Sequence, residues 1–259
     1  MSRDSTVKVL SVALLLCVVC SILVSGAAVL LQERQARNKV EEKRKNILLA
    51  AGLYDPTQPI EVQFDQIEPR IVDLQSGEFR QDIDAATFDS RSAARDPATS
   101  YRIPAELDLA GIKAHSRYQD VYLVWDGSRL QQIVLPVYGK GLWSTMYGFI
   151  SLGYDFNTVV GFAFYEHGET PGLGGEIDNP AWKQQWPGKK IYDRAGNTRI
   201  EVLKGRVDKN ADAAIHQVDG LAGATLTARG VSRLLQYWMG DNGYKPFIEN
   251  LKRKGATHE

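Results

Sequence analysis

The sequence predicts an α+β protein: one N-terminal transmembrane helix followed by a mostly antiparallel sheet domain covered on one face by helices. Three observations predict this class. Residues 9–31 form an apolar run without a charged residue, strand-like segments flank short turns between residues 121 and 167, and a helix with one apolar face begins near residue 225.

The composition is that of a globular protein with a full-sized core. Hydrophobic residues make up 44% of the 259 residues and charged residues 24%, which is ordinary for a folded domain. Lys and Arg together number 31, as do Asp and Glu. Because the charges balance, the composition gives no sign of a nucleic-acid partner or of an acidic substrate.

The apolar run from Val9 to Leu31 is long enough to cross a membrane. At about 1.5 Å per residue it makes a helix of about 34 Å, against a bilayer core of about 30 Å. A cleaved signal peptide is the alternative because residues 25–27 are small, but the run exceeds the usual apolar region of about 7–15 residues. We therefore expect an uncleaved single-pass anchor over residues 1–33.

Both cysteines, Cys17 and Cys20, lie inside this run. Their spacing is that of a metal or redox pair, but either chemistry needs a polar and accessible setting that a bilayer does not supply. Packing against lipid or a neighbouring helix is the simpler interpretation. A metal ligand set shared with a partner subunit is the alternative.

The charges around the span conflict with export of the large domain. Arg3 and Lys8 precede the span, whereas six basic residues soon follow it: Arg34, Arg37, Lys39, Lys43, Arg44 and Lys45. The positive-inside rule would therefore place the large domain in the cytoplasm.

Three further segments follow the anchor. Apolar residues recur at helical spacing until Gly52, which predicts a juxtamembrane helix over residues 34–54. Residues 55–115 are polar, interrupted by prolines and weakly periodic, and predict an irregular subdomain packed on the main domain. The main domain is expected over residues 116–259.

Strand-like segments at the start of the main domain predict an antiparallel meander. They are VYLVW (121–125), LQQIVLPVYG (130–139), YGFISLGY (147–154) and TVVGFAFYEH (158–167). Asp126-Gly127 is a favoured hairpin turn between the first two, and a second turn lies near Asp155.

The remaining elements are mostly helices. Asn179 and Pro180 have the chemistry of a helix cap and first turn, so a short helix is expected over 180–186. IEVL (200–203) predicts another strand. Helices follow after residue 225 and over residues 246–252.

Short motifs give no catalytic or metal site. The histidines lack pairwise metal spacing; they are His115, His167, His216 and His258. PGLGGE (171–176) lacks the last glycine of a dinucleotide fingerprint, and GKG (139–141) lacks the hydroxyl residue of a phosphate loop. No catalytic residue is predicted.

The segment LAGATLTARG (221–230) is unusual because small residues and two threonines gather at the start of a helix. A hydroxyl without a neighbouring base is a poor nucleophile, which argues against a hydrolase. Backbone N–H groups at a helix start suit a phosphate. Ordinary helix capping by Thr225 or Thr227 is the alternative.

Two loops also combine glycines with polar and apolar groups. HGETPGLGGEIDN (167–179) leaves a predicted strand, and GLWSTMYGF (141–149) puts Trp143 and Tyr147 among small and hydroxyl residues. Either loop could hold a planar ligand. A tight strand-to-helix connection and a core aromatic beside a turn are the alternatives.

DGLAGATLT (219–227) resembles the motif at which FMN is esterified through its phosphate to a threonine in the FMN-binding subunits of bacterial membrane respiratory complexes. With GKGLWSTMYGFISL (139–152), HGETPGLGGEI (167–177) and the N-terminal span, it makes the chain similar to the C subunits of the Na+-translocating NADH:quinone oxidoreductases. The resemblance runs from the anchor to about Gly240, and four motifs in order are more specific than any one.

The resemblance implies that Thr225 carries FMN as a phosphoester, beside Gly223 and Ala224. Where this sequence has Ala222, the motif usually has serine or threonine, so a side-chain hydrogen bond from that position is absent. A flavin transferase that takes FMN from FAD is the implied maturation partner. This explains why Thr225 needs no base of its own.

We expect the two glycine-rich loops to line the flavin ring. The expected lining residues are Trp143, Ser144, Thr145, Glu169, Thr170, Leu173 and Gly174.

The implied function is electron transfer through this FMN among the other subunits of a membrane respiratory complex. The protein is not itself the NADH or quinone site. The family places the domain on the periplasmic side of the bacterial inner membrane, contrary to the charge count, and we follow the family because the implied transferase works there. The FMN subunit of the related Rnf electron-transfer complex and a flavin-free anchored binding protein are the alternatives.

Overall fold

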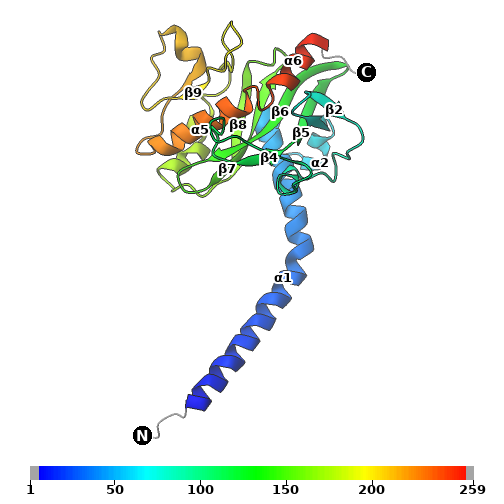
Figure 1. The fold of residues 1–259 in the computed structure, drawn as a ribbon, viewed down its shortest axis with the longest axis vertical. Coiled ribbons are helices and arrows are strands. Elements are labelled where there is room, and N and C mark those ends of the chain that lie inside the picture. The colour runs from blue at the N-terminus through cyan, green and yellow to red at the C-terminus, as the bar shows by residue number, and fades with distance from the viewer. Residues whose placement is uncertain (1–5, 255–259) are drawn as a thin grey trace. The chain divides into compact units, whose positions relative to one another are not determined.

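The computed structural model describes residues 6–254 of the chain (Figure 1). It divides into two compact units, Met1–Lys43 and Arg44–Glu259. The first unit contains most of one long helix, and the second contains the end of that helix and all the strands.

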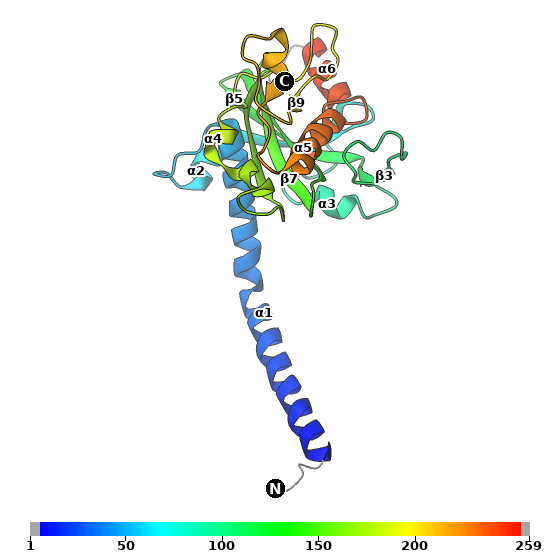
Figure 2. The same ribbon diagram turned by 90° about the vertical axis from the view of Figure 1, so that its left-hand side faces the viewer.

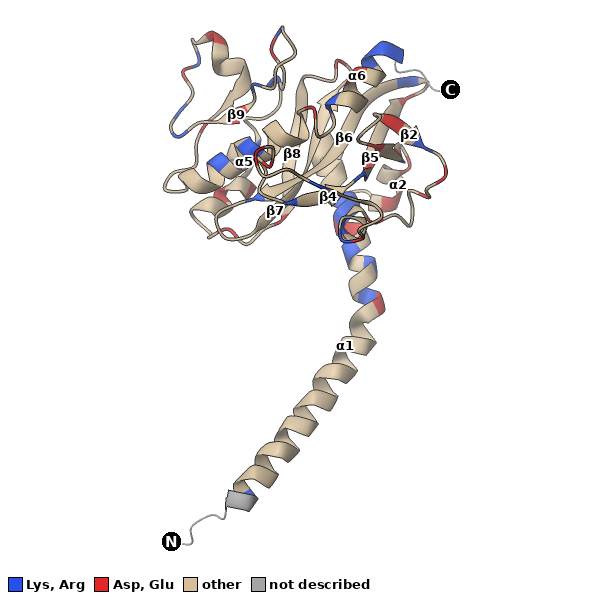
Figure 3. Cartoon of the chain, viewed as in Figure 1, with Lys and Arg blue, Asp and Glu red and all other residues tan. Residues whose placement is uncertain are grey.

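The long helix α1 (Thr6–Ala51) has the features of a membrane span. Among the described residues it is the one helix long and apolar enough to cross a bilayer, and the apolar side chains along its span are exposed. Figure 3 shows this stretch free of charged residues, with basic residues beginning beyond it.

Helix α1 ends at Ala51, at the glycine that the sequence indicated. Gly52 has φ +68°, and the N–H groups of Gly52 and Leu53 donate to the carbonyls of Leu49 and Leu48 at 3.2 and 2.9 Å. This is the Schellman arrangement, which needs a left-handed residue after the helix.

The second unit is built on a six-stranded antiparallel sheet with the order β2-β1-β5-β6-β7-β8. Its strands are β1 (Ile67–Asp73), β2 (Glu78–Arg80), β5 (Tyr118–Asp126), β6 (Arg129–Lys140), β7 (Thr145–Gly153) and β8 (Val159–Glu166). The predicted meander is therefore confirmed. The first turn lies one residue later than predicted, because Asp126 pairs with Arg129 and Gly127 takes the left-handed conformation.

The segment 55–115 differs from the irregular chain that its composition suggested. Strand β1 pairs with β5 along its whole length, from Ile67 opposite Val124 to Asp73 opposite Tyr118, and so belongs to the central sheet. The rest of the segment holds short elements: α2 (Ile60–Phe64), α3 (Ser90–Ala93), β3 (Ser100–Arg102) and β4 (Ala114–Ser116).

Both faces of the sheet are covered, whereas the sequence predicted helices on one face. Helices α5 (Thr225–Trp238) and α6 (Lys245–Lys254) belong to the main core. The last turns of α1, with Ile47 and Leu48, pack with Phe149 and Ala163 in a second core. The end of the predicted juxtamembrane helix therefore buries side chains in the domain.

The chain between β8 and α5 forms short elements beside the sheet. They are the 3-10 helices η1 (Gly174–Asp178) and η2 (Asp212–His216), helix α4 (Pro180–Lys183) and the parallel pair β9 (Glu201–Val202) and β10 (Gln217–Val218). Asn179 caps α4 by accepting from the N–H of Ala181 at 2.9 Å, as predicted. The strand predicted at 200–203 forms as β9, outside the central sheet.

Candidate functional site

Three segments of the second unit meet around the start of α5. They are the loop between β6 and β7 (141–144), the loop that follows β8 (167–174) and the first turn of α5. Helix α5 contacts β6 and β9, and Figure 2 shows α5 next to β9. Glycines let α5 pack closely on β6. A Cβ at Gly139 would lie 2.5 Å from Leu234 Cβ, and one at Gly230 would lie 2.6 Å from the Lys140 carbonyl oxygen.

Thr225 is the first residue of α5. Ala224 precedes it with φ −127° and ψ 46°, and no side chain caps the helix, so the capping alternative is not what the structure shows. The first N–H groups of any α-helix lack partners within the helix. Thr225 is half-buried and its neighbours Gly223 and Leu226 are exposed, so the hydroxyl lies at an accessible edge.

Gly223 brings residues 219–224, which we call the attachment segment because they precede the threonine expected to carry FMN, against the loop after β8. It has φ +70°, and a Cβ there would lie 2.9 Å from Leu173 Cδ2. A larger residue would therefore be strained in its backbone and would displace Leu173.

Glu169 is the hydrogen-bond centre of the site. Its side chain is buried and accepts from the backbone N–H groups of Trp143 at 2.9 Å, Leu142 at 3.2 Å and Ser144 at 3.4 Å. It also accepts from the hydroxyl of Thr227. Burial raises the pKa of Glu169, but these hydrogen bonds together lower it further, so its pKa lies below the usual 4.5.

The two threonines of α5 have different environments. Thr227 is 1% exposed and its hydroxyl is bonded to Glu169. Among residues 6–254 no hydrogen bond is found for the Thr225 hydroxyl. Thr227→Ala is therefore no neutral comparison for Thr225, because it removes a buried hydrogen bond.

The predicted ring residues are brought together, but they are not equally exposed. Trp143 is 67% exposed and Leu173 44%, whereas Glu169 and Gly174 are buried. Ser144 joins the two loops, since its Oγ accepts from the N–H of Gly168 at 2.6 Å. Of the remaining two, Thr145 is half-buried and Thr170 is exposed.

His167 links the loop after β8 to the 3-10 helix η1. Its Nδ1 accepts from the N–H of Glu169 at 3.2 Å, and its Nε2 is hydrogen-bonded to Asp178 Oδ2 at 2.7 Å. Sequence reasoning considered this histidine only as a metal ligand. Its place as the first residue of HGETPG was the available signal for a loop role.

Arg91 is a second residue that sequence reasoning missed. Its guanidinium lies 3.5 Å from the ring centroid of Tyr147 and donates to the Tyr165 hydroxyl and to Glu166 at 2.9 and 2.8 Å. It therefore holds the ends of β7 and β8, from which the two loops leave. No motif identifies it, because its partners are distant in sequence.

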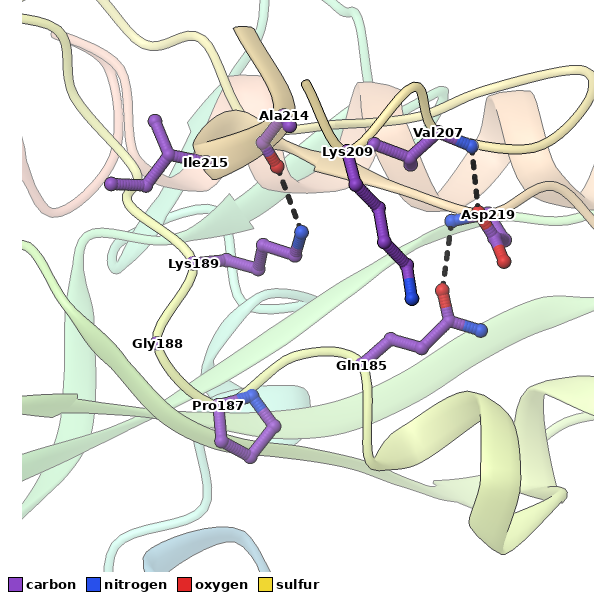
Figure 4. A pocket seen from close by; sticks show the side chains of 9 residues that line it. All are labelled: Gln185, Pro187, Gly188, Lys189, Val207, Lys209, Ala214, Ile215 and Asp219. Atoms are coloured by element: carbon purple, nitrogen blue, oxygen red, sulfur yellow. Dashed lines mark hydrogen bonds between the residues drawn. The ribbon is translucent and has the colours of Figure 1, made fainter. Parts of the chain in front are cut away.

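Asp219 holds the other end of the attachment segment (Figure 4). Its carboxylate accepts from the N–H of Val207 at 2.7 Å, its own N–H donates to Gln185 Oε1 at 3.0 Å, and its carbonyl accepts from Trp182 Nε1 at 3.0 Å. A hollow of about 600 Å³ lies beside it, with Lys189 and Lys209 in its wall. None of the predicted ring residues lines this hollow.

Comparisons with known proteins show which family the chain resembles. A family model described as an FMN-binding domain matches residues 141–240, a range that contains every predicted site residue. The chain is 49% identical to the C subunit of the Na(+)-translocating NADH-quinone reductase of Pseudomonas aeruginosa, over 99% of each chain. It is 46% identical to that of Neisseria meningitidis, over 98% of this chain and 97% of the relative.

The chain belongs to the family of C subunits of the Na+-translocating NADH-quinone reductase. Membership makes it a component of that translocase. The crystal structure of NqrC from Shewanella oneidensis is 36% identical and covers 84% of this chain and 99% of its own, with a TM-score of 0.77. The crystal structure of the C subunit from Parabacteroides distasonis is 27% identical, with coverages of 84% and 96% and a TM-score of 0.65.

Family membership also bears on the alternatives. The relatives named above belong to the Na+-translocating reductase rather than to the Rnf complex. The FMN-binding domain match argues against a flavin-free binding protein.

Proposed function

We propose that the chain is a membrane-anchored electron carrier that holds FMN as a phosphoester on Thr225. The observation that carries this proposal is the position of Thr225: its half-buried hydroxyl begins α5 where the three loop and helix segments meet. The carrier passes electrons between partner subunits of the Na+-translocating NADH:quinone reductase. The flavin supplies the redox chemistry, and the protein supplies tethering, orientation and electrostatics.

The start of α5 suits the phosphate of a bound FMN. Its unpaired N–H groups and the helix dipole favour an anion, by roughly 0.3–1 kcal/mol for the dipole alone at an exposed helix end. Gly223 is exposed and carries no side chain, so its backbone can be approached closely from the solvent side. The residues present therefore fit the phosphate end of the cofactor.

The two loops suit the ring end. Trp143 presents exposed aromatic surface in the 141–144 loop, and Leu173 presents exposed apolar surface beside Gly223. The buried Glu169 keeps its loop in place. A planar ring needs such surfaces with a few fixed polar groups. These residues would hold the ring, while Glu169 and Gly174 support them from behind.

Attachment requires another enzyme, because Thr225 has no base of its own. We propose that a flavin transferase catalyses it: the threonine oxygen forms a bond to the FMN phosphorus of FAD, AMP leaves, and the transferase takes the hydroxyl proton. We further propose that α1 crosses the inner membrane once and that the large domain faces the periplasm, where this transferase works.

The test of attachment uses Thr225→Val, which removes the hydroxyl but keeps the side-chain volume. We expect the wild-type band to fluoresce under ultraviolet light after denaturing electrophoresis and the variant band to be dark. Thr227→Ser keeps a hydroxyl at the neighbouring position and is expected to fluoresce like wild type. A fluorescent Thr225→Val band would overturn the assignment.

A further inference from the structure

Glu169 connects three segments without any charged partner. Its own loop, the 141–144 loop and the first turn of α5 all meet at this one carboxylate, which accepts three backbone N–H groups and the Thr227 hydroxyl. Among the described residues no Lys or Arg forms an ion pair with it. The carboxylate therefore serves as an acceptor that several donors share.

Glycines enclose this carboxylate on two sides. A Cβ at Gly141 would lie 2.5 Å from Glu169 Oε1, and one at Gly174 would lie 2.9 Å from Glu169 Oε2 and 2.6 Å from Thr227 Oγ1. The backbone of two loops is thus packed directly on the carboxylate. This enclosure leaves Glu169 only 4% exposed, so it does not present a surface to a ligand.

The hydrogen bond to Thr227 sets the rotation of the first turn of α5. Residues two positions apart point to nearly opposite sides of a helix with about 3.6 residues per turn. Thr227 points inward to Glu169, so Thr225 points outward to the accessible edge. The same carboxylate fixes the backbone of Trp143, whose indole is exposed.

We propose that Glu169 is a positioning residue that sets the placement of Trp143 relative to Thr225, so that both meet the same flavin ring, and that it does not itself touch the ring. The proposal takes the place of the expectation that Glu169 lines the ring. The proposal rests on the proposed function, because it assumes a flavin on Thr225.

The test compares the flavin fluorescence of the folded and the denatured full-length protein, isolated from a host that contains the transferase. Fluorescence after denaturation measures how much flavin is covalently bound. The ratio of native to denatured fluorescence measures how close the ring lies to Trp143, because a nearby indole quenches an excited flavin by electron transfer. The ratio does not depend on how much of the protein carries flavin, because both signals scale with the amount bound.

We expect a low ratio in the wild type and a several-fold higher ratio in Glu169→Gln, whose amide replaces one acceptor oxygen with a donor. Thr227→Val, which removes only the hydroxyl, is expected to raise the ratio as well. Thr227→Ser and Glu176→Gln, a glutamate on the neighbouring 3-10 helix, are expected to match the wild type. Ile248→Ala, a core truncation on α6, controls for lost stability and is expected to keep the low ratio.

The proposal is overturned if Glu169→Gln and Thr227→Val keep the wild-type ratio. If Glu169→Gln does not fold, the Thr227→Val and Thr227→Ser pair decides: a raised ratio in the first alone supports the proposal, and equal ratios overturn it. A wild-type protein without fluorescence after denaturation contradicts the attachment to Thr225 instead, and with it the basis of this proposal. The two failures are therefore distinguishable.

Discussion

At the scale of single residues, the buried carboxylate of Glu169 organises the candidate site. Glu169 is held as a carboxylate by N–H and O–H donors, so its pKa lies below the usual 4.5 although burial raises it. A depressed pKa in the folded state means that the ion stabilises the fold above the unfolded-state pKa. This contribution is lost as the pH falls through the folded-state pKa.

Glu169→Gln is therefore expected to destabilise the protein most at neutral pH. The loss is about 1–3 kcal/mol in the free energy of unfolding, because the buried N–H donors lose an acceptor. Denaturant unfolding at a series of pH values measures it. The wild-type advantage is expected to shrink below about pH 4.5, and a gap that stays constant down to pH 3 would rule out the ionised carboxylate as its source.

Gly223 is the second residue whose substitution is expected to affect both stability and the flavin. It combines a left-handed backbone conformation with a close contact to Leu173. We expect Gly223→Ala to cost roughly 1–2 kcal/mol from backbone strain and, in addition, to shift the visible spectrum of the flavin. Gly172→Ala is the matched comparison, since Gly172 has φ +74° with nothing within 4 Å of its Cβ position. It is expected to lose similar stability with an unchanged spectrum, and equal spectral shifts in the two variants would contradict this account.

At the scale of elements, the packing of α5 on β6 brings the attachment threonine to the loops. Gly230 lies in this contact, where a Cβ would lie 2.6 Å from the Lys140 carbonyl oxygen. Alanine favours a helix over glycine by about 1 kcal/mol, whereas overpacking costs about 1–3 kcal/mol. We expect the overpacking cost to exceed the gain in helix propensity at Gly230, because the obstructing atom belongs to the backbone.

Gly230→Ala is therefore expected to lower the thermal unfolding midpoint, measured by circular dichroism. Arg229→Ala, at the exposed neighbouring position, is expected to change stability by less than about 0.5 kcal/mol. A stabilised Gly230→Ala protein would show that α5 can move away from β6 without penalty.

Local signals explain which elements could be predicted. The meander from β5 to β8 follows from alternating segments and short turns, and the stop of α1 follows from Gly52. Strand β1 was missed because it contains Pro69 and charges, and its partner β5 follows only after a long intervening segment. The docking of the last turns of α1 was missed for the same reason, since Gly161 and Ala50 touch only in the folded chain.

The candidate site, like the fold, could be predicted where the signal is local in the sequence. Motif resemblance identified Thr225 and both loops, and the structure brings them together. The role of the Glu169 carboxylate could not be read from the sequence, because its hydrogen-bond partners lie between 25 and 58 residues away. Asp219 lies inside the motif, but only the folded chain shows that it fixes Val207 and Gln185.

At the scale of the whole molecule, one helix that can span a membrane precedes the unit that contains the candidate site. Basic residues follow the span (Figure 3), which by charge alone favours a cytoplasmic domain. The family resemblance favours the periplasm. The two arguments make opposite predictions about the C-terminus.

An alkaline phosphatase fused after Glu259 decides between them. We expect the fusion to be active and a fluorescent protein that folds only in the cytoplasm to stay dark at the same position. An inactive phosphatase with a fluorescent reporter would place the domain in the cytoplasm, and would also separate it from the transferase that we propose.

The central claim is that FMN is bound to Thr225, and peptide mass spectrometry of the protein from its native membrane tests it most directly. Trypsin cleavage after Lys209 and Arg229 releases one peptide that contains both Thr225 and Thr227. The account predicts that this peptide carries the added mass of FMN less one water and that fragment ions place it on Thr225. An unmodified peptide, or a flavin located on Thr227, would contradict it.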